Sequence, residues 1–428
     1  MLRTAVVVLL IAVVPGVRPV AAQEVPRVFR GLFRASDTPA DSRHRVDLST
    51  LISGVYATAE LDQQPASGAF DVPLYEATMV GTTPLLQYAF VGQRRVFGTV
   101  LAGSFARYGS VNWRATRYFA HTRFATPTGP RTSLSLRALA SYSPFYTFDL
   151  SLDPERDETD LLPTDETQPM AYQSTTFYDL SAQLRHRLST RSDIGLNVGA
   201  AYTDYANAGI DSITPSGSLR YSRGMTEHTR LQLGYGFRQW NYPDAALPVV
   251  RSHDIITGVS YARPLPFARR TQVGFDLGSA VAQTPDAWRY DINAAAFVMQ
   301  PIGRAWVAVA SYRHGLDART GLSAPLYLFG DTAAVTLAGL VARRVVVRAT
   351  GTYVSGTSMF EESRERNRWW SASTSISTLL FGAAAAFVQA GWTGQRFTAE
   401  TGVITGLPTV VDRISVSAGL SLGLALVR

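Results

Sequence analysis

The sequence contains no cysteine and no lysine, so all 40 of its basic side chains are arginines. Without cysteine, neither disulfide bonds nor thiolate metal sites can form, and stability must come from hydrogen bonds and packing. Long apolar runs are scarce as well. Beyond the N-terminus no segment holds the ~18 consecutive apolar residues that a transmembrane helix requires. Charged residues make up only 17% of the chain, while aromatic residues reach 11% and glycines number 34.

The N-terminus has the layout of a secretory signal peptide. Arg3 precedes an apolar run over residues 5–14, and the small residues 20–22 provide a cleavage site ahead of Gln23. Pro15 ends the apolar run well short of the ~20 residues that would span a membrane. We therefore expect the protein to be exported.

A period of two dominates the rest of the chain. Over residues 414–426 a large apolar side chain or alanine stands at every second position, with serine, glycine or alanine between. This alternation indicates a β-strand with one apolar and one polar face, long enough to cross a bilayer at a tilt. Eighteen such segments are found, at 46–58, 82–91, 95–106, 111–124, 131–143, 176–187, 192–205, 214–223, 228–240, 252–263, 269–281, 288–300, 303–314, 331–341, 344–355, 369–379, 382–394 and 412–427.

An even number of strands is what an antiparallel barrel needs to close with both termini on one side. The sequence thus predicts an all-β fold, a transmembrane antiparallel up-and-down β-barrel of about 18 strands. Its expected parts are a signal peptide (1–22), a short periplasmic segment (23–45) and the barrel (46–428). Sixteen strands remain an alternative, because 111–124 is the poorest alternating segment and the link 107–110 is very short for an external loop.

The links between these segments alternate in length, which independently supports the barrel. The short ones are 92–94, 127–130, 188–191, 224–227, 264–268, 301–302, 342–343 and 380–381. The longer ones are 59–81, 144–175, 206–213, 241–251, 282–287, 315–330, 356–368 and 395–411. In such barrels short turns face the periplasm and long loops face outward.

The two faces of each segment predict a wet interior. Leu231, Leu233 and Tyr235 would meet lipid, while Arg230 and Gln232 between them would line the inside. A soluble sandwich would reverse this arrangement, and the alternation alone does not distinguish the two. Tyrosines and tryptophans near the segment ends favour lipid, because an interfacial ring suits a side chain with one polar and one apolar end.

An arginine-lined lumen would bind carboxylates and phosphates through forked hydrogen bonds. The expected lumen wall comprises Arg137, Arg185, Arg220, Arg230, Arg238, Arg289 and Arg348, with Arg114 and Arg304 as further candidates. The arginines are spread evenly through the strands and form no single patch, which argues against nucleic-acid binding despite the net charge of +7.

The longest link, 144–175, concentrates acidic residues and is a candidate constriction loop. Its acids include Asp153, Glu155, Asp157, Glu158, Asp160, Asp165 and Glu166. By position and charge it resembles the constriction loop of general diffusion porins, which sets acids opposite arginines across the lumen. Opposed charges across a narrow aqueous gap would orient dipolar solutes. The alternative is a solvated acidic surface loop that binds divalent cations.

Evidence for enzymatic chemistry is thin. The six histidines show no metal-ligand spacing, so we expect neither a metal nor another cofactor. The pair His253 and Asp254 resembles the acid and histidine pairs of omptin-type outer-membrane proteases, but adjacent residues of a strand point to opposite faces. No catalytic residue is predicted, and a barrel-embedded hydrolase is a further alternative.

The hairpins within 177–242, with the sequences YDLSAQLRHRLSTRSDIGLNVGAAYTDY and SGSLRYSRGMTEHTRLQLGYGFRQWNY, resemble the β-barrel porins associated with exopolysaccharide export. The resemblance implies a conduit for anionic polysaccharide. The chain departs from the usual proteobacterial barrel at its end, where Leu426, Val427 and Arg428 replace a final Phe or Trp that serves as the assembly signal.

The expected function is a porin-like channel in the outer membrane of a Gram-negative-type bacterium, passing hydrophilic, anionic solutes or polysaccharide. The alternative is a structural or adhesive barrel with a blocked lumen. Expected partners are outer-membrane lipid, lipopolysaccharide, the transported solute and the barrel-assembly machinery. A homo-oligomer is an open expectation, since no interface signature is present.

Overall fold

A computed structural model describes residues 44–61, 76–92, 95–109, 113–144, 174–205, 211–243, 249–265, 268–283, 288–320, 325–358, 366–381, 384–396 and 410–427. The predicted signal peptide, most of the periplasmic segment and most of the acidic loop lie outside these ranges. The described residues form eighteen strands. They are β1 (His44–Leu61), β2 (Glu76–Val91), β3 (Val96–Tyr108), β4 (Trp113–Pro127), β5 (Thr132–Ser143), β6 (Thr175–Arg187), β7 (Ser192–Tyr205), β8 (Ser212–Gly224), β9 (Thr229–Trp240), β10 (Val250–Leu265), β11 (Ala268–Gln283), β12 (Trp288–Ile302), β13 (Trp306–Thr320), β14 (Pro325–Ala342), β15 (Val345–Ser358), β16 (Arg366–Phe381), β17 (Ala384–Arg396) and β18 (Val410–Val427).

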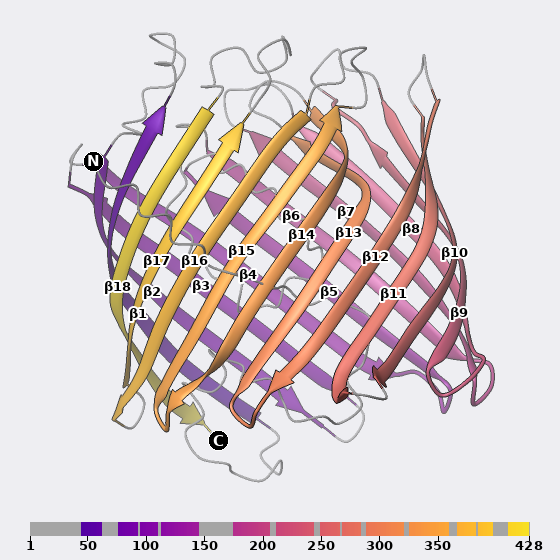
Figure 1. The fold of residues 1–428 in the computed structure, drawn as a ribbon, viewed down its shortest axis with the longest axis horizontal. Helices are drawn as coiled ribbons and strands as arrows, with labels where there is room; N and C mark the ends of the chain where they lie inside the picture. Colours follow the sequence, from indigo (N-terminus) through magenta and orange to yellow (C-terminus); the bar gives the residue numbers. More distant parts are fainter. Residues whose placement is uncertain are drawn as a thin grey trace.

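The strands form a closed antiparallel barrel (Figure 1). Each strand pairs with the next one along the chain, and β1 pairs with β18, so that Ile52 lies opposite Leu420 and the sheet has no free edge. Closure satisfies the backbone hydrogen-bonding groups of every strand within the sheet. The predicted fold class and the count of 18 are therefore confirmed. No helix in the described part of the chain is long and apolar enough to cross a membrane.

The poorest predicted segment is a full strand, β4, which rules out the sixteen-stranded alternative. Its inner face mixes Arg117 and Arg123 with the buried Phe119 and His121. The apolar residues on the inner face are what obscured the alternation. Its outer face follows the rule, with Tyr118 about half exposed.

One predicted loop is largely strand. Residues 315–330 were expected to form an external link, but β13 continues to Thr320 and β14 begins at Pro325. The two extensions pair in register from Gly315 with Gly330 to Thr320 with Pro325. The alternation here is short and is interrupted by glycine, so the sequence does not indicate a strand. Pairing with a partner strand determines whether such a segment is extended.

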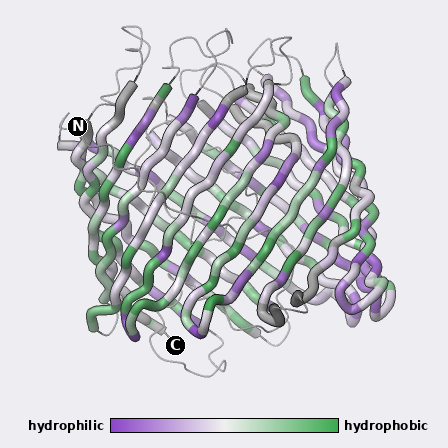
Figure 2. The backbone as a smooth tube through the Cα atoms, in the orientation of Figure 1, coloured by the Kyte–Doolittle hydropathy of each residue, from purple (hydrophilic) through white to green (hydrophobic). Residues whose placement is uncertain are grey.

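Large apolar side chains cover the outside of the barrel. On each strand they occupy alternate positions, as with Ile414, Val416 and Leu420 on β18, all of which are exposed. Hydrophobic and hydrophilic residues are interleaved along the strands and do not separate into different regions (Figure 2). In a closed barrel this alternation means an apolar exterior and a more polar interior, which suits a strand wall surrounded by hydrocarbon.

Aromatic side chains on the outer face mark two levels. Towards the long loops, Tyr118 and Tyr142 have ring centroids 6.2 Å apart, and Tyr178 and Tyr202 stack at 6.3 Å. Towards the short turns, Tyr88 contacts Phe97, with centroids 5.8 Å apart. Such rings stand where hydrocarbon meets water, so the apolar band between them is the part that lipid covers.

Candidate functional site: the inner wall of the barrel

The seven arginines of the predicted wall all occupy inward positions. They are Arg137 on β5, Arg185 on β6, Arg220 on β8, Arg230 and Arg238 on β9, Arg289 on β12 and Arg348 on β15. Exposed apolar residues stand beside several of them, as Leu219 does beside Arg220, and Trp288 and Tyr290 do beside Arg289. Side chains at alternate positions of a strand point to opposite faces.

The two further candidates do not belong to the wall. Arg304 lies in the turn between β12 and β13, where it is exposed. Arg114 is on the same side of β4 as the exposed Tyr118. The prediction was wrong for both, in one case because the strand starts later than expected and in the other because the faces of β4 were hard to assign.

Arginine and glycine alternate across four neighbouring strands. Arg185 lies opposite Gly195, Gly195 opposite Arg220, and Arg220 opposite Gly234. A Cβ atom at Gly195 would meet no atom within 4 Å, so the wall is open at this point. Gly195 therefore leaves open space on the inner face between Arg185 and Arg220.

An aspartate on β7 partly neutralises this row. The carboxylate Oδ2 of Asp193 lies 2.7 Å from Nη2 of Arg185 and 3.9 Å from Nη1 of Arg230. Both arginine side chains are nearly half exposed, so these ion pairs stabilise the fold little. Two arginines share one carboxylate, and the group as a whole keeps a positive charge.

Two further aspartates face the lumen on β10 and β11. Asp254 is hydrogen-bonded by the side chains of Ser252 and Asn293, with Arg238 and Arg313 close enough to attract it. Asp276 accepts a hydrogen bond of 3.5 Å from Nε2 of Gln232. The inner wall therefore carries charges of both signs.

The wall is also uneven around its circumference. Most of the charged side chains face inward from β4–β13. The inner face of β16 and β18 instead presents small neutral residues, namely Ser371, Ser373, Ser375 and Ser377 on β16, and Ser415, Ser417, Gly419 and Ser421 on β18. The lumen thus has a charged side and a hydroxyl-rich side, an asymmetry that no single strand reveals.

The acidic constriction candidates lie outside the described residues. This applies to Asp153, Glu155, Asp157, Glu158, Asp160, Asp165 and Glu166. The strands that flank their loop are described, and Ser143 pairs with Thr175 at the point where the loop leaves the barrel. The role of these acids stays a prediction.

The histidine and aspartate on β10 do not form a dyad. His253 Nδ1 is hydrogen-bonded to the hydroxyl of Tyr235, 2.7 Å away on the outer face, whereas Asp254 contacts residues of the inner face. Among the described residues, no group of three or more His, Asp or Glu side chains has an arrangement that could hold a metal ion.

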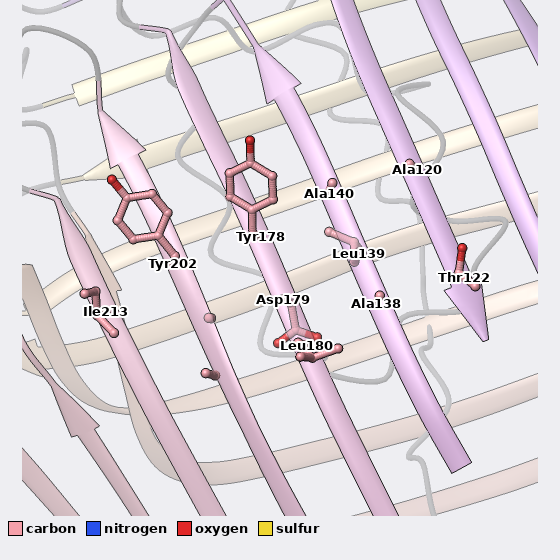
Figure 3. A pocket seen from close by; sticks show the side chains of 12 residues that line it. Ala120, Thr122, Ala138, Leu139, Ala140, Tyr178, Asp179, Leu180, Tyr202 and Ile213 are labelled. Carbon is pink, nitrogen blue, oxygen red and sulfur yellow. The ribbon is translucent and has the colours of Figure 1, made fainter. Parts of the chain in front are cut away.

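A hollow of about 500 Å³ lies on β4–β8, mainly on their outer face. Figure 3 shows Tyr178 and Tyr202 side by side on neighbouring strands, with Ala138 and Ala140 on another strand of the same hollow. Its lining is mostly apolar, so it suits hydrocarbon and not a hydrophilic solute. The hollow is therefore part of the lipid-facing surface.

No protein-family model and no curated protein matches the chain. Among solved structures it is similar to OccK2 (OpdF) of Pseudomonas aeruginosa in complex with glucuronate, with 10% identity, a TM-score of 0.48, and coverage of 90% of this chain and 98% of that one. It is also similar to the outer membrane protein OpdK of the same organism, with 9% identity, a TM-score of 0.47, and coverage of 89% of this chain and 98% of that one. A third similar structure is OccAB4 of Acinetobacter baumannii, with 11% identity, a TM-score of 0.45, and coverage of 89% of this chain and 98% of that one.

Proposed function

We propose that the protein is an outer-membrane channel that passes hydrophilic, anionic solutes through an arginine-lined lumen. The observation that carries this proposal is the inward placement of Arg185, Arg220, Arg230 and Arg238 on neighbouring strands of a closed barrel with an apolar exterior. Eighteen strands enclose a space too wide for wall side chains to fill. Charged arginines in that space require water.

Transport along this wall relies on weak, repeated contacts between the solute and the arginines. A guanidinium group offers a carboxylate or phosphate two parallel hydrogen bonds, so each arginine of the row is a resting point for an anion. Asp193 competes for two of these arginines and lowers their affinity for a passing solute. Conduction needs binding that is favourable enough for entry and weak enough for release.

The proposal places the protein in the outer membrane of a Gram-negative-type bacterium. Its partners there are outer-membrane lipid and lipopolysaccharide, the barrel-assembly machinery that inserts it, and the solute. The proposal includes assembly into a homo-oligomer. No enzymatic activity is proposed.

The acidic loop is proposed as a constriction opposite the arginines. Neutralising Asp157, Glu158 and Asp160 together should then raise the preference for anions and change the single-channel conductance. A solvated surface loop predicts no change in conductance. The comparison therefore separates the two readings of this segment.

Export of an anionic polysaccharide is the narrower form of the proposal. It is supported by the resemblance of the hairpins within 177–242, which fold as β6–β9 and carry four of the seven wall arginines. An acidic polysaccharide added to one side of a planar bilayer should then interrupt the current in a length-dependent way. A neutral polysaccharide of the same length is the control.

The decisive experiment is electrical. Purified protein reconstituted into planar bilayers should give stepwise currents, and in a salt gradient the reversal potential should report a preference for chloride over potassium. Folded protein that carries no current would instead support the structural or adhesive barrel. A preference for cations would contradict the role of the arginine row.

A further inference from the structure

The hairpin of β13 and β14 extends beyond its neighbour on one side. Pairing between β12 and β13 ends at Ala294 and His314, although β12 itself continues to Trp288. Pairing between β13 and β14 goes on to Thr320 and Pro325. The end of the hairpin is thus held by β15 on one side and is released from β12 on the other.

Three glycines cross the hairpin at the point of release. Gly315 on β13 pairs with Gly330 on β14, which pairs with Gly356 on β15. A Cβ at Gly330 would lie 2.5 Å from the carbonyl oxygen of Ser355 and 3.0 Å from the Cα of Gly356, so no other residue fits. Glycines inside strands mark bends and close approaches of backbone.

Phe329, next to this glycine line, contacts a strand that is not its neighbour. It is only 2% exposed and packs with Ala280 and Ala282 of β11. Strands β11 and β14 are separated by β12 and β13, which is three spacings or ~14 Å along a regular sheet. A phenylalanine side chain does not bridge such a gap, so the hairpin must lean over the inner face of β12.

Three contacts of charged or titratable side chains lie beside the packed Phe329 ring. The guanidinium of Arg289 on β12 lies over the Phe329 ring, 5.1 Å from its centroid. His314 bridges the neighbouring strands, with Nε2 3.1 Å from Asp291 of β12 and Nδ1 2.9 Å from Asp331 of β14. The histidine contacts thus link the strands near the point where the backbone ladder between β12 and β13 ends.

We propose that the end of the β13–β14 hairpin, residues 315–320 and 325–330, narrows the lumen, and that Phe329, buried against β11, holds the hairpin in this position. The effect on conductance rests on the proposed channel function, whereas the position of the hairpin does not depend on it. The Phe329 ring fits against β11 because Ala280 and Ala282 have small side chains. Arg289 is a positioning residue that holds the ring, and so differs in role from the other wall arginines.

A cross-linking experiment tests the packing of Phe329 against β11 without any measurement of current. The chain contains no cysteine, so Ala282→Cys combined with Phe329→Cys provides the two thiols, and a short bifunctional thiol reagent should join them. The matched control joins Ala282→Cys with Val354→Cys, an inward residue of β15, which lies one strand further away. Cross-linking of the first pair alone supports the proposal. Absence of a link in the first pair, or equal links in both, overturns it.

Conductance tests the narrowing. Phe329→Ala should raise the single-channel conductance, and Phe329→Leu should raise it less. Tyr353→Ala removes an aromatic ring from the outer face of the adjacent strand and should leave conductance unchanged. A parental conductance in Phe329→Ala would refute the narrowing even if the cross-link forms. A protein with no current in any variant would contradict the channel function, and the cross-link would still decide the position of the hairpin.

Discussion

The Nη2 atom of Arg185 lies 2.7 Å from the Oδ2 atom of Asp193 on the neighbouring strand of the lumen wall. This contact shows that arginines and acids are interleaved on the same wall. A solute that moves along β6–β9 therefore meets guanidinium groups that are already partly engaged. The electrostatic potential of the lumen depends on how many of these arginines are not paired with a carboxylate at a given time.

Removing the charge of Asp193 should make the lumen more selective for anions. Asp193→Asn removes the carboxylate that Arg185 and Arg230 share, and with it a negative charge that repels a passing anion. The reversal potential in a salt gradient should shift towards that of chloride. Asp211→Asn is the matched control, because Asp211 accepts a hydrogen bond from Tyr202 on the outer face. An unchanged potential in Asp193→Asn would show that this pair lies away from the ion path.

Reversing the charge of the arginine row should reduce or invert the anion preference. Arg220→Glu with Arg230→Glu replaces two positive charges by two negative ones on adjacent strands, and the local potential changes sign. The effect should weaken at high salt because the charges are screened over about 3 Å at 1 M. Arg304→Glu alters the net charge in an exposed turn and serves as the control. Equal shifts from the row and from the turn would argue that only net charge matters.

Placing an arginine on the outer face should destabilise the barrel, whereas the adjacent inner position should tolerate it. Val198 is exposed on the outer face near the middle of β7, and Asn197 beside it faces the lumen. An arginine near the middle of the bilayer costs about 2–4 kcal/mol. Urea titration of Val198→Arg in lipid vesicles should show this loss, and Asn197→Arg should unfold close to the parent. The reverse order would place hydrocarbon inside.

Thiol labelling should report the two faces directly. Gln183 and Leu184 are consecutive residues of β6 and point to opposite sides. In membranes, a membrane-impermeant maleimide should modify Gln183→Cys and leave Leu184→Cys unmodified, because only the lumen holds water. The absence of native cysteine makes the signal unambiguous. Equal labelling of both positions in an intact membrane would contradict the assignment.

Strand count and facing could be read from the sequence because a period of two is a local property. Each of the eighteen predicted segments overlaps a strand, including the weak one over 111–124. The seven wall arginines fall on the inner face for the same reason: once one residue of a strand is assigned to lipid, every second residue follows.

Contacts between strands were not readable in this way. The pairing of Arg185 with Asp193 depends on the register between β6 and β7, and the small neutral face of β16 and β18 emerges only when the barrel is closed. The sequence predicts a loop where β13 and β14 extend to Thr320 and Pro325, because glycines interrupt the alternation there and pairing between the strands stabilises them.

The amino-acid sequence by itself determined that this chain forms an alternating, outwardly apolar set of strands, because side-chain direction in a strand follows from chain geometry alone. Only the tertiary structure decided which charges meet and where the hairpin bends. Phe329 reaches Ala280 across two intervening strands, and such a contact depends on the curvature of the whole sheet and not on the residues beside it in the chain.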